Sequence, residues 1–134
     1  MSWVKLYSRI NKRLGENDLF TKITYLKDAI LYVEANGKLD IYNAPYYLDE
    51  IKEYLGKTYA KELILDFSGI SNVASIGLRA ILELHKIMQG RNYPLKLKNV
   101  NKEVLYAFQI TGFDKFLIIE NDSDNGEGEE SARS

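Results

Sequence analysis

Cysteine is absent from this sequence of 134 residues, and histidine and tryptophan occur once each. Without cysteine the chain forms no disulfide and no thiolate metal site, which fits a reducing compartment. The single His85 argues against a histidine-based metal centre and against a Ser-His-Asp triad. No apolar run approaches the roughly 20 residues of a membrane span, and the first residues lack the apolar core of a signal peptide. We therefore expect a cytoplasmic protein without an integral membrane segment.

Motifs of cofactor and nucleic-acid binding are also missing. The net charge of −1 provides no basic field for nucleic acid. The glycines form neither a dinucleotide-binding G-x-G-x-x-G nor a phosphate-binding G-x-x-x-x-G-K-[ST] pattern. Asp40, Asp66 and Asp114 end or follow expected strands, but no spacing brings them together, and most such carboxylates cap helices or form turns. We therefore expect no metal, no cofactor and no enzymatic activity.

The composition, 46% hydrophobic and 28% charged, is that of an ordinary globular protein of one domain. Apolar patterns predict strands at 21–27, 29–40, 62–68, 94–99 and 115–120, and helices near 43–56, 75–89 and 101–111. The order is therefore β-β-α-β-α-β-α-β, which predicts a mixed, mostly parallel sheet. We expect a two-residue turn at Lys27-Asp28 and a turn or bulge at Asn36-Gly37. Asn43 and Asn101 are the expected helix N-caps, and Gly56 and Gly112 are expected to end helices.

Two segments of opposite charge flank the domain, which we expect to span residues 21–119. In the N-terminal extension, residues 1–20, large apolar side chains recur at helical spacing among basic residues and predict a helix: Trp3, Tyr7, Ile10 and Leu14. We favour a helix or an arm packed on the domain or across a dimer over docking on a partner or a membrane surface. Residues 120–134 form an acidic tail, which we expect to be disordered.

The stretch DFSGISNVASIGLRAIL, from Asp66 to Leu82, places a serine-rich turn before the helix that begins near Ser75. Ser75 is well suited to cap that helix, a role worth about 1 kcal/mol. A second interpretation is that this serine accepts a phosphate, because a helix N-terminus stabilises an anion. Gly77 costs about 1 kcal/mol of helix propensity relative to alanine and would leave the backbone open around such a group.

Three segments together resemble the STAS domain, the family of sulphate-transporter and anti-sigma-factor-antagonist domains. They lie in the family's order across residues 21–119: VEANGKLDIYNA, with its G-x-L-D turn; ELILDFSGISNVASIGLRAILELHK; and NVNKEVLYAFQITGFDKFLII, with T-G-F-D after the helix. The resemblance implies a single α/β domain with a four- to five-stranded sheet and helices packed mainly on one side.

The resemblance also implies a function. Stand-alone bacterial members are anti-sigma factor antagonists that bind an anti-sigma factor with serine kinase activity; phosphorylation of the antagonist ends binding, and a phosphatase reverses it. The family motif Asp-Ser-[Ser/Thr/Ala]-Gly-Leu places the phosphoacceptor at Ser75, although Ala74 replaces the Asp and Ile76 is bulkier than usual. The expected partner-binding residues are Asp40, Asn43, Asn72, Val73, Ala74, Ile76, Gly77 and Leu78.

An alternative role comes from other STAS domains, which are subunits of membrane transport complexes such as lipid-transport ATPases and act by protein binding without phosphorylation. A basic N-terminal extension is compatible with that role. A neighbouring gene for a histidine-kinase-like ATPase would favour the phosphorylation switch, and one for a transporter ATPase or permease would favour the subunit role.

We predict that removal of residues 122–134 leaves the melting temperature nearly unchanged, because the tail cannot bury enough apolar surface to offset its ordering entropy. Thermal unfolding of the full chain and of a chain that ends at Asn121 measures this. A drop of several degrees in the shorter chain would show that the tail docks on the domain.

Overall fold

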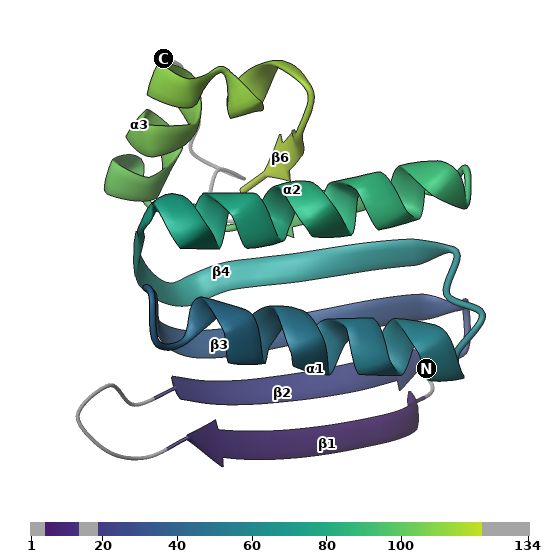
Figure 1. Ribbon diagram of the computed structural model, residues 1–134. Helices are drawn as coiled ribbons and strands as arrows, with labels where there is room; N and C mark the ends of the chain where they lie inside the picture. Colours follow the sequence, from purple (N-terminus) through teal and green to yellow (C-terminus); the bar gives the residue numbers. More distant parts are fainter. Residues whose placement is uncertain (1–4, 14–18, 122–134) are drawn as a thin grey trace.

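The computed structural model describes residues 5–13 and 19–121. Within these ranges six strands form one sheet in chain order, joined by three helices and one short 3-10 helix (Figure 1). The elements are β1 (Lys5–Arg13), β2 (Leu19–Leu26), β3 (Ile30–Leu39), α1 (Ala44–Lys57), β4 (Glu62–Val73), α2 (Ser75–Gly90), β5 (Leu95–Lys98), α3 (Lys102–Thr111), η1 (Phe113–Lys115) and β6 (Ile118–Glu120).

From β2 onward, the order of strands and helices is the predicted β-β-α-β-α-β-α-β. The sheet is mixed, as expected: β1, β2 and β3 pair antiparallel, whereas β3, β4, β5 and β6 are parallel neighbours. Helices α1 and α2 lie side by side on one face of the sheet, and α3 contacts β4 and η1 (Figure 1). Each helix begins and ends within one residue of its predicted bounds.

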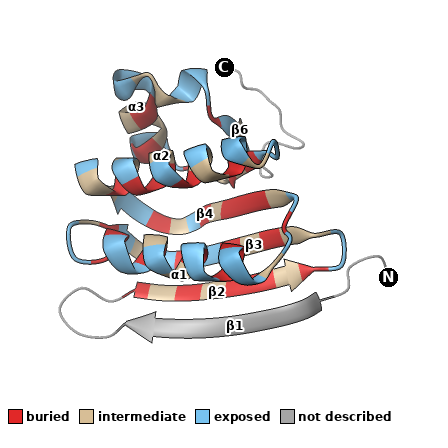
Figure 2. Cartoon of the chain, turned by 45° about the vertical axis from the view of Figure 1, so that its right-hand side comes forward, coloured by how far each residue is buried: buried red, intermediate tan, exposed pale blue. Residues whose placement is uncertain are grey.

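The core lies between the sheet and the helices α1 and α2. On β3, Leu31, Val33 and Ala35 are buried and alternate with more exposed residues, as expected for a strand with one covered face (Figure 2). The helices meet these strands with stripes of buried residues: Tyr47, Ile51, Tyr54 and Leu55 from α1, and Ala80, Ile81, Leu84 and Met88 from α2. Each large apolar side chain buried in this way stabilises the fold by about 1.5–3 kcal/mol. This layer fixes where both helices begin.

The N-terminal extension is a strand rather than the predicted helix where the structure describes it. Lys5–Arg13 forms β1, which pairs antiparallel with β2 from Lys5 opposite Leu26 to Arg13 opposite Leu19. The helical spacing was misleading because pairing with a neighbouring strand satisfies the same backbone groups, and tertiary context overrides local propensity. Residues 1–4 and 14–18 of the predicted extension lie outside the described residues, as do residues 122–134 of the predicted tail.

Some boundary residues act as predicted and others do not. Asn101 Oδ1 accepts a hydrogen bond from the Val104 N–H at 2.8 Å, and Gly112 ends α3 with a φ of 80°. The predicted two-residue turn is wrong: β2 and β3 are joined by three residues, of which Ala29 takes the left-handed conformation at a φ of 64°. Gly56 does not end α1, because the helix continues to Lys57.

Two bulges interrupt the pairing of β3 with β4 around Asn36-Gly37, where a turn or a bulge was predicted, and the extra residues lie on β4. The register with β4 shifts between Glu34 and Asn36 and again after Gly37, whose φ is 136°. Gly69 of β4 lies against the Asn36 side chain and the Ala35 carbonyl. A Cβ atom at Gly69 would lie 2.5 Å from that carbonyl oxygen, so no other residue fits there without a shift of the backbone. The bulges let β3 and β4 remain paired beyond this point.

Candidate functional site

The serine-rich segment before α2 is part of a strand and not the predicted turn. β4 runs for 12 residues, from Glu62 to Val73, and stays paired with β3 up to Leu39 opposite Val73. The chain then passes into α2 through Ala74 alone, whose N–H donates to the Leu39 carbonyl at 3.0 Å. Parallel pairing supplies the hydrogen bonds that a turn would otherwise need, which explains why a polar sequence remains extended.

Ser75 is the first residue of α2 and does not cap it. The N-cap is Ala74, which is extended and whose carbonyl accepts from the Leu78 N–H at 3.0 Å. The predicted capping role of Ser75 is therefore wrong, because the chain enters the helix one residue earlier than that role requires. The Ser75 side chain is exposed, and no acidic residue lies in the first turn of α2.

Gly77 is buried and packs α2 against the end of β3. A Cβ atom at this position would lie 2.6 Å from the Leu39 carbonyl oxygen and 2.8 Å from Val73 Cγ1. The glycine is therefore required by close contact between helix and sheet, and not, as predicted, by open backbone around a phosphate. Gly77 is itself buried, and its contact with β3 sets the position of the first turn of α2, which contains Ser75 and Ile76.

The start of α1 lies beside the start of α2, at the ends of β3 and β4. Asp40 Oδ1 accepts hydrogen bonds from the N–H groups of Tyr42 at 3.0 Å and Asn43 at 2.9 Å. Asn43 occupies the predicted N-cap position, but its side chain does not cap the helix. It is only 1% exposed and donates instead to the Lys38 carbonyl at 3.0 Å. Asn43 is thus a structural residue, which corrects its predicted place on the exposed surface.

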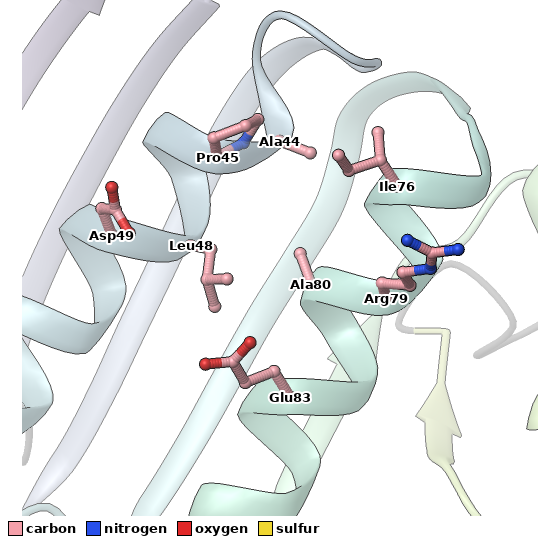
Figure 3. Close-up of a pocket in the computed structure, with 8 residues that line it drawn as sticks. All are labelled: Ala44, Pro45, Leu48, Asp49, Ile76, Arg79, Ala80 and Glu83. Carbon is pink, nitrogen blue, oxygen red and sulfur yellow. The ribbon is translucent and has the colours of Figure 1, made fainter.

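A groove runs between the first turns of α1 and α2, with Ile76 on its wall (Figure 3). Its volume is about 240 Å³, and its lining combines an apolar floor with a charged rim: Ala44, Pro45, Leu48, Asp49, Ile76, Arg79, Ala80 and Glu83. Lys52 of α1 bridges to Glu83 of α2 at 2.8 Å. Of the predicted surface residues, Asn72 is exposed, whereas Asp40, Val73, Ala74, Ile76 and Leu78 are half-buried. These six residues and Ser75 lie at the same end of the sheet.

Three exposed apolar residues at this end were not identified from the sequence. Ile41 is 65% exposed, Tyr42 57% and Tyr46 56%. All three follow Asp40, in the connection from β3 to α1 or in the first turn of α1. The sequence DIYNAPYY could have indicated them. Tyr47 belongs to the buried stripe of α1, so the nearby Tyr42 and Tyr46 face outward. Exposed apolar side chains that cluster are typical of binding surfaces in general, and these three make this end of the domain a candidate for one.

The three candidate carboxylates are not brought together into a catalytic site. Asp66 lies in β4, Asp114 lies in η1, and Asp40 binds the backbone before α1. Partial burial raises the pKa of Asp66, but hydrogen bonds donated by the Ser68 N–H and the Tyr32 hydroxyl outweigh it, so the pKa lies below its usual value. Across the described residues, no group of three or more histidine or acidic side chains could hold a metal ion. His85 packs on the Phe116 ring, with centroids 4.9 Å apart.

A family comparison identifies the fold. The STAS domain family model matches residues 22–126 of this chain. In the described part of the chain, no helix is both long and apolar enough to cross a membrane.

Solved structures with the same fold come from several organisms. A Thermotoga maritima protein described as an anti-sigma factor antagonist is 19% identical, with 83% of this chain and 85% of that chain covered and a TM-score of 0.64. The anti-sigma factor antagonist SpoIIAA in its unphosphorylated form is 14% identical, with 87% and 91% covered and a TM-score of 0.63. A sulfate transporter family protein from Wolinella succinogenes is 21% identical, with 69% and 76% covered and a TM-score of 0.61.

We predict that Gly77→Ala destabilises the domain by about 1–3 kcal/mol, because the added methyl group overlaps the Leu39 carbonyl and this strain exceeds the gain in helix propensity. Urea unfolding measures the free energy of unfolding. Gly56→Ala is the matched control, since that helical glycine has nothing within 4 Å of a new Cβ atom. Equal stability of the Gly77→Ala and Gly56→Ala variants would contradict the packing role.

Proposed function

The chain belongs to the STAS domain family, and from that premise we propose that it is an anti-sigma factor antagonist controlled by phosphorylation of Ser75. One observation carries the proposal. Ser75 is exposed at the first position of α2, directly beside Ile76 on the wall of the groove between α1 and α2. A modification there changes the charge of the surface that a partner would cover. The likeness to SpoIIAA supports this assignment, since that protein's structure is also known in a phosphorylated form.

The partner is an anti-sigma factor with serine kinase activity, and a phosphatase removes the phosphate. The proposed binding surface combines the predicted residues that reach the surface with the exposed apolar residues beside them: Asp40, Asn72, Val73, Ala74, Ile76, Leu78, Ile41, Tyr42 and Tyr46. Asn43 and Gly77 are buried beneath this surface, where they contact the Lys38 and Leu39 backbone at the end of β3. Binding in the unmodified state would occupy the anti-sigma factor and free its sigma factor in the cytoplasm.

Phosphorylation acts on binding and not on folding. A phosphate adds about −1.5 to −2 charges at pH 7, and a helix N-terminus stabilises negative charge. The fold therefore tolerates the modified serine. A partner that covers the same surface must remove water from the phosphate beside Ile76, which is costly against an apolar or acidic face. The unmodified hydroxyl carries no such cost.

We predict that Ser75→Asp weakens binding of the anti-sigma factor at least about tenfold, whereas Ser75→Ala binds like the wild type but is not phosphorylated. Ser75→Ala should unfold like the wild type, because the Ser75 side chain does not cap α2, and Ser75→Asp should be at least as stable, because a helix N-terminus stabilises negative charge. Calorimetric titration gives the affinities, and incubation with the kinase and ATP followed by mass spectrometry locates the phosphate. If Ser75→Asp binds with wild-type affinity, the proposed phosphorylation switch is wrong. A phosphate found on Ser68 or Ser71 would assign the modification to that residue instead.

We predict that Ile76→Arg also weakens binding at least about tenfold, because the new charge must be desolvated in the interface. Ile76 is half-buried at the groove wall, so the domain should stay folded. Ile110→Arg is the matched control, since Ile110 is 66% exposed on α3. If the two variants bind the anti-sigma factor equally well, the proposed surface is wrong.

The Wolinella succinogenes structure favours a second candidate function. That protein is described as a member of the sulfate transporter family and shares the fold. In this role the chain would be a subunit of a membrane transport complex and would bind its partner without phosphorylation. Affinity purification from the native cell, with mass spectrometry of Ser75, separates the two roles. Recovery of a transporter ATPase or permease with unmodified Ser75 would support the second role.

A further inference from the structure

Arg79 lies one helical turn after Ser75 on the surface of α2. Residues four apart on an α-helix lie on the same face, about 5–6 Å apart at their Cβ atoms. Side chains in a helix also lean toward its N-terminus, so Arg79 covers the turn that contains Ser75. Both residues are exposed. Figure 3 shows the Arg79 side chain on the α2 wall, on the side of the first turn and directed away from Asp49 of α1.

The charge of Arg79 has no partner in the described part of the chain. The nearest acid along the same helix face is Glu83, which binds Lys52 of α1 at 2.8 Å. The hydrogen bond that Lys52 donates to Glu83, together with the negative charges of Glu83 and Asp49, holds the pKa of Lys52 above its usual value. Asp40, the acid at the end of β3, accepts hydrogen bonds from the backbone before α1. A cation close to the positive end of a helix is thus left without a compensating anion.

We propose that Arg79 is the intramolecular partner of the phosphate on Ser75, an inference that rests on the proposed function. The planar guanidinium donates two parallel hydrogen bonds to phosphate oxygens, which a lysine at this position could not reproduce. The pairing draws the phosphate along α2 and takes Arg79 away from the rim of the groove. Phosphorylation therefore alters two features of the binding surface, a new anion at Ser75 and a reoriented cation at Arg79.

The test uses the full chain with phosphoserine incorporated at position 75 during translation, so that no kinase is needed. Phosphorus NMR follows the second ionisation of this phosphate, which has a pKa near 6 when unperturbed. A paired guanidinium favours the dianion, so Arg79→Gln should raise that pKa by about half a unit or more. Arg79→Lys should give an intermediate value. Lys86→Gln, which removes an exposed charge farther along α2, should leave the pKa unchanged.

The melting temperature of the unmodified chain provides the structural control. Arg79→Gln should leave it unchanged, because the side chain is exposed and makes no hydrogen bond or ion pair among the described residues. An identical phosphate pKa in the wild type and Arg79→Gln would overturn the pairing while leaving the proposed switch intact. A raised pKa in Arg79→Gln, with Ser75 never phosphorylated in the native cell, would support the pairing and overturn the proposed switch.

Discussion

The carbonyl oxygen of Leu39, at the end of β3, sets the geometry of the whole site. It accepts the Ala74 N–H at 3.0 Å and lies so close to Gly77 that no side chain fits between them. One atom therefore holds both the end of β4 and the first turn of α2. Asp40 follows Leu39 directly and binds the backbone that leads into α1. The starts of both helices are thus positioned from one point on the sheet.

The two helix starts differ in charge although they lie side by side. The carboxylate of Asp40 binds N–H groups just before α1 and supplies negative charge there. The first turn of α2 has no acidic residue, and its N-cap, Ala74, has no polar side chain. Arg79 adds positive charge one turn later. The same end of the sheet therefore contains one neutralised helix start and one electropositive start, and the exposed serine lies at the electropositive one.

The helices could be predicted closely because their ends depend on local signals. Asn101 and Gly112 act through hydrogen bonds and backbone conformation within a few residues, so the sequence reveals them. The strand pairings could not be predicted in the same way. β1 and the last residues of β4 are extended because a neighbouring strand is present, and that neighbour cannot be read from their own residues.

The positions of the candidate site residues could be predicted in part. The exposure of Ser75 and the grouping of Asp40 with Ile76 follow from strands that end at a common edge. The burial of Asn43 and Gly77 does not, since each depends on a contact with β3 that only the folded chain creates. The reason predicted for Gly77 was also wrong. A glycine in a sequence does not show which neighbouring atoms occupy the space of the absent side chain, here the Leu39 carbonyl and Val73.

The pairing of β4 with β3 up to Val73 limits how far the backbone beside Ser75 can move. β5 pairs with Leu63–Asp66 only, so the end of β4 pairs with β3 alone, and only Ala74 separates this end from Ser75. A displacement of the serine backbone would disturb the parallel pairing of this end of β4 with β3. The pairing therefore restrains this position more than a loop would. A chemical change at Ser75 remains local, and a second molecule can detect it only by direct contact with that end of the domain.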